Sequence, residues 1–136
     1  MKVIGISGLE NAMPFKRAQW PGLEERELRI AQGMDAAAAL IVDGEIVAAA
    51  EQERFTGRKH TGEFPMDAIR FCLAQGGLTM AGIDELAHGF DYAPYRELYA
   101  HDQVSAALYR QVFSREALLA QVRRELPEFP EARVHS

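Results

Sequence analysis

A dense group of charged and hydrogen-bonding side chains follows an apolar run in the middle of this sequence. The run EIVAAA leads directly into EQERFTGRKHTGEFP, in which Arg54, Lys59 and His60 are cationic heads. Together they could clamp a phosphate or polarise a carbonyl group. Gly57 and Gly62 would let the backbone approach a ligand closely. Residues 51–63 are therefore a candidate site, and the competing interpretation is a solvated strand end.

Two shorter patterns could contribute to the same chemistry. The sequence GISG places Gly5, Ser7 and Gly8 at the end of a β-branched run, where exposed backbone N–H groups can cradle an anion. The competing interpretation is an ordinary tight turn. Asp35 stands just before the next apolar run, where its carboxylate could orient a substrate hydroxyl or cap a turn.

Other kinds of chemistry find little support. The formal net charge is −5 and the basic residues are scattered, which argues against nucleic acid as the main partner. No apolar run reaches the roughly 18 residues of a membrane span, so we expect no membrane association and a cytoplasmic location. The single cysteine, Cys72, excludes an internal disulfide and sits in an apolar run typical of an inert buried thiol. The histidines lack the spacing of metal ligands: His60, His88, His101 and His135.

The elements that must position these residues alternate between strands and helices. A strand is predicted over residues 2–8, followed by an insertion at about 9–33 with one short helix beginning at Pro21 and ending at Gly33. Two apolar runs flank Asp43-Gly44, the dipeptide of a type I′ turn, and predict a β-hairpin. Both arms are almost continuously apolar, which predicts that both faces of the sheet are covered.

The second half of the chain is predicted to be mostly helical. Pro65 suits the first position of a helix whose buried stripe is Ala68, Ile69, Cys72 and Leu73. A strand should include residues 86–90, and helices should occupy 94–113 and 114–126, the last with Ser114 as N-cap. Residues 132–136 read as the start of another strand. We therefore expect a single α/β domain over residues 1–136 that is truncated.

The run DAAAALIVDGEIVAAAEQERFTGRKHTGEFPMDAIRFCLAQGGL, together with VIGIS, resembles the start of the O-carbamoyltransferases of antibiotic and nodulation-factor biosynthesis, such as tobramycin carbamoyltransferase. The resemblance covers residues 2–6 and 35–90. It implies an actin/hsp70-like (ribonuclease H-like) mixed sheet with helices, of which this chain would hold an incomplete half. Family members carry a further domain that makes carbamoyl-adenylate from ATP and carbamoyl phosphate.

The resemblance also implies roles for individual residues. Arg54, Lys59 and His60 would hold the phosphate and carbamoyl oxygens during transfer to the hydroxyl of a small-molecule acceptor. Asp35 matches the Asp of the family's His-Asp pair, beside the acceptor. An iron-type divalent metal is implied as well, with ligands outside this chain.

One departure from the family pattern matters for catalysis. The family's general-base histidine stands before that Asp, and here the position is Met34, whose thioether cannot accept a proton near neutral pH. His60 or a residue of the insertion could replace it. We expect a carbamoyltransferase segment that is inactive alone and requires the remainder of the protein, fused or as a separate chain. The alternative is a non-catalytic scaffold subunit with the same fold.

Overall fold

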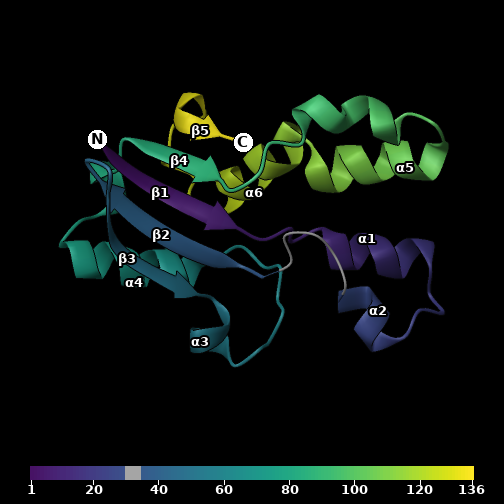
Figure 1. Ribbon diagram of the computed structural model, residues 1–136, viewed down its shortest axis with the longest axis horizontal. Coiled ribbons are helices and arrows are strands. Elements are labelled where there is room, and N and C mark those ends of the chain that lie inside the picture. Colours follow the sequence, from purple (N-terminus) through teal and green to yellow (C-terminus); the bar gives the residue numbers. More distant parts are fainter. Residues whose placement is uncertain (30–34) are drawn as a thin grey trace.

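The computed structural model describes residues 1–29 and 35–136, and in them a five-stranded mixed sheet carries helices (Figure 1). The strand order is β3-β2-β1-β4-β5. Strand β1 pairs antiparallel with β2 and parallel with β4, β2 pairs antiparallel with β3, and β4 pairs parallel with β5. The predicted α/β class is confirmed. The strands are β1 (Lys2–Ser7), β2 (Ala37–Val42), β3 (Glu45–Glu51), β4 (Glu85–His88) and β5 (Val134–His135).

The hairpin of β2 and β3 forms as the sequence predicts. Asp43 and Gly44 both have positive φ, 51° and 91°, as a type I′ turn requires. The pairing shifts by one residue between Leu40 and Ile41, which is a β-bulge. Bulges increase the local twist of an edge strand. Strand β3 is such an edge, since it pairs on one side only.

One face of the sheet is covered by helices α4 (Met66–Gly76) and α6 (Arg115–Glu125), which form the main core. The predicted stripe of α4, residues 68, 69, 72 and 73, is buried as expected. Ser114 caps α6 by accepting a hydrogen bond from the amide of Ala117 at 3.2 Å. Burial of each large side chain in such a core contributes about 2 kcal/mol. Fully buried members from the strands are Ile4, Leu40, Leu86 and Val134.

The prediction that both faces of the sheet are covered is met on one face only. In the part of the chain that the structure describes, Ala49 of β3 is exposed, as are Ile46 and Val47, at 72% and 43%. An almost continuously apolar strand therefore does not show whether the described part of this chain covers one face of the sheet or both. The described residues also contain no helix long and apolar enough to cross a membrane.

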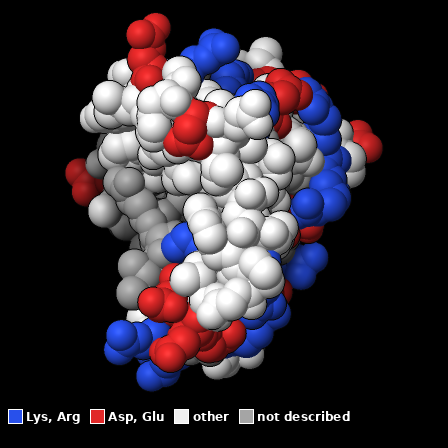
Figure 2. Space-filling view, turned by 90° about the vertical axis from the view of Figure 1, so that its right-hand side faces the viewer, with Lys and Arg blue, Asp and Glu red and all other residues white. Residues whose placement is uncertain are grey.

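A second group of helices lies beyond the end of the sheet toward which β1 points (Figure 1). It has its own small core, built on Phe15, Tyr92 and Val112. Seen from that end, charged side chains lie mostly around the margin of a broad uncharged area (Figure 2). The members are α1 (Ala12–Gln19), α2 (Glu25–Arg29), the 3-10 helix η2 (Ala93–Tyr99), α5 (Gln103–Leu108) and the π-helix η3 (Tyr109–Phe113).

Several element boundaries differ from the predictions. The described part of the insertion, up to residue 29, holds two helices, of which α1 was not predicted. Helix α2 begins at Glu25, four residues beyond the predicted Pro21, and the predicted end at Gly33 lies outside the described residues. The helix predicted over 94–113 is divided into η2, α5 and η3. Pro65 precedes α4, and Phe90 lies beyond β4. The remaining short elements are α3 (Glu53–Thr56), η1 (Met80–Gly82) and η4 (Glu131–Arg133).

Candidate functional site

Asp35 and His60 meet beside the end of β1. The Nδ1 atom of His60 lies 3.1 Å from Oδ1 of Asp35. Both side chains are largely exposed, at 61% and 68%, so the pair is open to a ligand from solvent. The arrangement is a carboxylate–imidazole pair in which the carboxylate can fix the ring and its tautomer.

Backbone contacts around this pair hold both partners in place. The hydroxyl of Ser7, the last residue of β1, donates to the carbonyl oxygen of Asp35 at 2.8 Å. The amide of Ala36 donates to the carbonyl oxygen of Thr61 at 2.8 Å, which ties the strand entrance to the loop that carries His60. Asp35 is therefore tied to the end of β1, and the residue after it is tied to the loop of His60.

The loop from residue 57 to residue 63 has an unusual backbone. Gly57 and His60 both adopt the left-handed region, with φ of 70° and 54°. For a residue with a Cβ this conformation costs about 1–2 kcal/mol. An ion pair between Arg58 and Glu63 closes the loop. A non-glycine residue held in this region by surrounding contacts is a common feature of functional sites.

A polar cleft of about 160 Å³ opens beside the pair. Three of its lining residues are acids, Asp35, Glu51 and Glu53, against the two basic groups Arg54 and His60. Arg54 is engaged by Glu51 at 3.1 Å between Nε and Oε2. With Arg54 bonded to Glu51, the imidazole of His60 is a candidate proton acceptor in the cleft. The cleft is lined by Asp35, Ala36, Glu51, Glu53, Arg54, His60 and Thr61.

The structure brings some of the predicted site residues together and separates others. Arg54, His60 and Asp35 share the polar cleft, whereas Lys59 is exposed and is not among its lining residues. Gly5 lies within β1, and its surface belongs to a larger apolar hollow on the open face of the sheet. Gly8 has φ of 119° and packs against residues 36 and 62.

The described residues do not provide a metal site. No group of three or more His, Cys, Asp or Glu side chains in residues 1–29 and 35–136 is arranged to hold a metal ion. The donor set of this part of the chain therefore does not fit the metal that the sequence resemblance implies. Met34, at the position where the resemblance implies a histidine, lies outside the described residues.

Two residues that support the elements around the site were not singled out from the sequence. Gln52, at the end of β3, is 3% exposed and bonds to the first turn of α4. His88, at the end of β4, lies 3.0 Å from the carbonyl oxygen of Gly8 through its Nε2 atom. Both directly follow or end an apolar strand, which is the signal that could have identified them.

Comparison with known protein families identifies the family of this chain. Residues 28–115 match the family model described as the carbamoyltransferase N-terminus, which is more than half of the chain. The chain therefore belongs to the carbamoyltransferase N-terminus family. The matched region includes the hairpin, the loop with His60 and helix α4.

Three relatives are similar over shorter stretches. An uncharacterized protein of Synechocystis sp. is 48% identical over 50 residues, 37% of this chain and 8% of that protein. The nodulation protein NolNO of Sinorhizobium fredii is 39% identical over 54 residues, 40% of this chain and 8% of that protein. An uncharacterized 19.2 kDa protein of Rhizobium etli is 38% identical over 52 residues, 38% of this chain and 30% of that protein. The matched stretches thus span less than a third of each relative.

Proposed function

We propose that this chain is the N-terminal part of an O-carbamoyltransferase, in which His60, oriented by Asp35, is the general base. The observation that carries the proposal is the contact of 3.1 Å between the two side chains at the edge of the polar cleft. The family membership supplies the class of reaction. The reaction moves a carbamoyl group from carbamoyl-adenylate to a hydroxyl of a small-molecule acceptor.

The geometry of the pair assigns a direction to the proton. Asp35 faces Nδ1 of His60, so the tautomer in which Nδ1–H donates to the carboxylate is favoured. Nε2 is then left with a lone pair that can accept the proton of the acceptor hydroxyl. The freed oxygen attacks the carbamoyl carbon, the bond from that carbon to the phosphate oxygen breaks, and AMP leaves with the electron pair.

The remaining components come from outside the described residues. Carbamoyl-adenylate would be made from ATP and carbamoyl phosphate by the remainder of the carbamoyltransferase, fused or as a separate chain. Any iron-type divalent metal would be held by ligands there, and no step above depends on it. Both substrates are cytoplasmic metabolites, so we place the protein in the cytoplasm. The actin-like architecture is part of this proposal, and a mixed five-stranded sheet is compatible with it.

The experiment measures transfer from radiolabelled carbamoyl phosphate, with ATP and a panel of hydroxylated sugars. The chain alone should give no labelled product, and a carbamoyltransferase that contains this chain should give it. His60→Gln in that protein should lower the rate by about 100-fold or more, as expected for loss of a general base. His101→Gln is the matched control, because His101 is exposed and lies outside the cleft. Equal rates for the two variants would remove His60 from the mechanism.

A further inference from the structure

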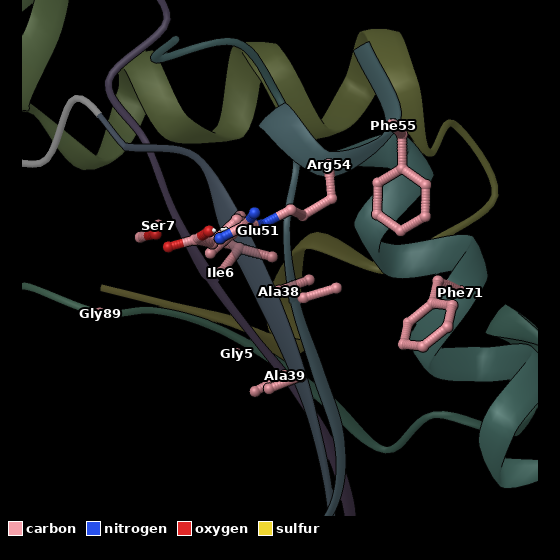
Figure 3. Close-up of a pocket in the computed structure, with 13 residues that line it drawn as sticks. Gly5, Ile6, Ser7, Ala38, Ala39, Glu51, Arg54, Phe55, Phe71 and Gly89 are labelled. Carbon is pink, nitrogen blue, oxygen red and sulfur yellow. Dashed lines mark hydrogen bonds and ion pairs between the residues drawn. The ribbon is translucent and has the colours of Figure 1, made fainter. Parts of the chain in front are cut away.

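His88 joins the ends of two neighbouring strands. It is the last residue of β4, which pairs in parallel with β1, so the two strands end at the same edge of the sheet. Its Nε2 atom lies 3.0 Å from the carbonyl oxygen of Gly8, the first residue after β1. Figure 3 shows this edge, where Ser7 and Gly89 lie on the adjoining segments. The imidazole of His88 therefore bridges the two segments where their pairing ends.

The contacts of the ring define which nitrogen donates. A carbonyl oxygen can only accept a hydrogen bond, so Nε2 carries the proton that is donated to Gly8. In the neutral ring Nδ1 has a lone pair, which accepts from the amide of Phe90 at 3.3 Å. The carbonyl oxygen of Phe90 lies 3.2 Å from the same atom and would accept from it in the protonated ring. Both forms of His88 therefore keep the bond to Gly8.

Gly8 in turn contacts both segments that carry the candidate site. Its φ is 119°, and a Cβ there would lie 3.1 Å from the Cβ of Ala36 and 3.1 Å from the carbonyl oxygen of Gly62. Ala36 follows Asp35 directly, and Gly62 is two residues beyond His60. Because protein interiors are closely packed, a displacement of Gly8 would displace the segments of both partners.

We infer that His88 is a positioning residue for the pair of Asp35 and His60. By holding the carbonyl group of Gly8, its Nε2–H keeps the turn after β1 in the conformation against which residues 36 and 62 pack. His88 is not among the residues that line the polar cleft, so it acts through Gly8 and takes no part in proton transfer. The inference rests on the proposed function for the purpose of the pair, but the geometry of the pair is measurable without any transfer.

The test compares two replacements of His88 in the full chain. His88→Gln keeps an N–H donor near the position of Nε2, whereas His88→Phe fills a similar space without a donor. Nitrogen chemical shifts report the tautomer of His60, whose contact with Asp35 favours the Nδ1–H form. His88→Phe should move His60 toward the Nε2–H form, and His88→Gln should retain the wild-type spectrum. His135→Phe is the matched control, because His135 ends the neighbouring strand β5 and contacts Glu85 instead.

A second measurement connects this geometry with the reaction. In a carbamoyltransferase that contains this chain, His88→Phe should lower the rate of carbamoyl transfer about tenfold or more, since misplacement of a catalytic group by about 1 Å can cost about 100-fold. His88→Gln should restore most of the rate. If His88→Phe does not fold, as judged by circular dichroism, His88→Asn replaces it, because its amide corresponds in position to Nδ1 and not to Nε2.

Three results would overturn the inference. These are an unchanged His60 tautomer in the variant that lacks the donor, equal effects of that variant and His88→Gln, or an equal effect of His135→Phe. A His60 spectrum that changes without any loss of transfer would support the positioning role of His88 and count against His60 as the general base. The two proposals can therefore fail separately.

Discussion

Gln52 caps helix α4 from the end of strand β3. Its side-chain oxygen accepts hydrogen bonds from the amides of Asp67 and Ala68, both at 3.1 Å, and its amide nitrogen donates to Oδ2 of Asp67 at 3.0 Å. The side chain is 3% exposed. These bonds satisfy N–H groups that have no partner within the helix. They also fix the point at which the loop toward His60 leaves the sheet.

Replacement of Gln52 should be strongly destabilising. Gln52→Leu leaves the amides of Asp67 and Ala68 buried without acceptors, and we expect the free energy of unfolding to fall by about 2–3 kcal/mol. Urea denaturation followed by circular dichroism measures the change. Gln75→Leu is the control, because Gln75 is exposed near the end of the same helix. A loss for Gln52→Leu no larger than that of the control would contradict the capping role.

Gly8 should tolerate a side chain less well than Gly57 does. Both have positive φ, 119° and 70°, so alanine strains either backbone. A Cβ at Gly8 would also lie 3.1 Å from the Cβ of Ala36 and from the carbonyl oxygen of Gly62, whereas none of the described atoms outside its chain neighbours lies within 4 Å of a Cβ at Gly57. Gly8→Ala should therefore lose about 1–2 kcal/mol more stability than Gly57→Ala. Thermal unfolding of the two variants measures the difference, and equal melting temperatures would contradict it.

The sequence predicted best where local chemistry alone decides the structure. The dipeptide Asp43-Gly44 determines its own turn, and the spacing of four apolar residues in α4 determines which side is buried. Ser114 caps α6 through its own side chain, as its residue type predicts. In these elements the interacting groups lie within a few residues of one another, so the pattern is visible without the fold.

The misses depend on contacts between distant segments. Helix α1 has Pro14 in its first turn and only Ala12 and Phe15 buried, so its weak stripe becomes meaningful only against Tyr92 and Val112. The contact between Asp35 and His60 joins residues 25 apart through strand pairing. Lys59 and His60 are neighbours in sequence, yet His60 lines the cleft and Lys59 does not. The backbone turns between them, with His60 in the left-handed region. The residue types identified the loop as a candidate site, but the path of the backbone determines which cationic side chain faces the cleft.

The tautomer of His60 provides a direct test of its contact with Asp35. In the wild-type chain the carboxylate favours the proton on Nδ1. Asp35→Asn removes the negative charge, so the balance should move toward the Nε2–H form that predominates in free imidazole side chains. Nitrogen chemical shifts of the neutral ring report the two forms. Asp43→Asn, at the exposed turn of the hairpin, should leave the His60 spectrum unchanged.

The acid stability of helix α5 should depend on Asp102. The Ser105 hydroxyl and the amides of Ser105 and Val104 donate to its carboxylate and hold its pKa below the ordinary value of 3.8. A lowered folded-state pKa gives stability that is fully present above pH 3.8 and is lost as the pH falls through the folded value. Asp102→Asn keeps a capping oxygen but removes the titration. The difference in melting temperature between the wild-type chain and Asp102→Asn should therefore shrink below pH 3.8. A difference that stays constant from pH 2 to 6 would contradict the assignment.

Cys72 should react slowly with alkylating reagents in the folded chain. It is 0% exposed, its Sγ lies 3.5 Å from the carbonyl oxygen of Ala38, and burial raises the pKa of its thiol above the usual 9.0. Because the thiolate is the nucleophile, a raised pKa and a closed core act in the same direction. Iodoacetamide at pH 8 should modify Cys72 about 100-fold more slowly in buffer than in urea, since opening of the core limits access. The double variant with Cys72→Ala and Ala74→Cys carries its thiol on the exposed side of α4 and should react at similar rates in both solvents. Rapid modification of native Cys72 would show that the contact between α4 and the sheet opens readily.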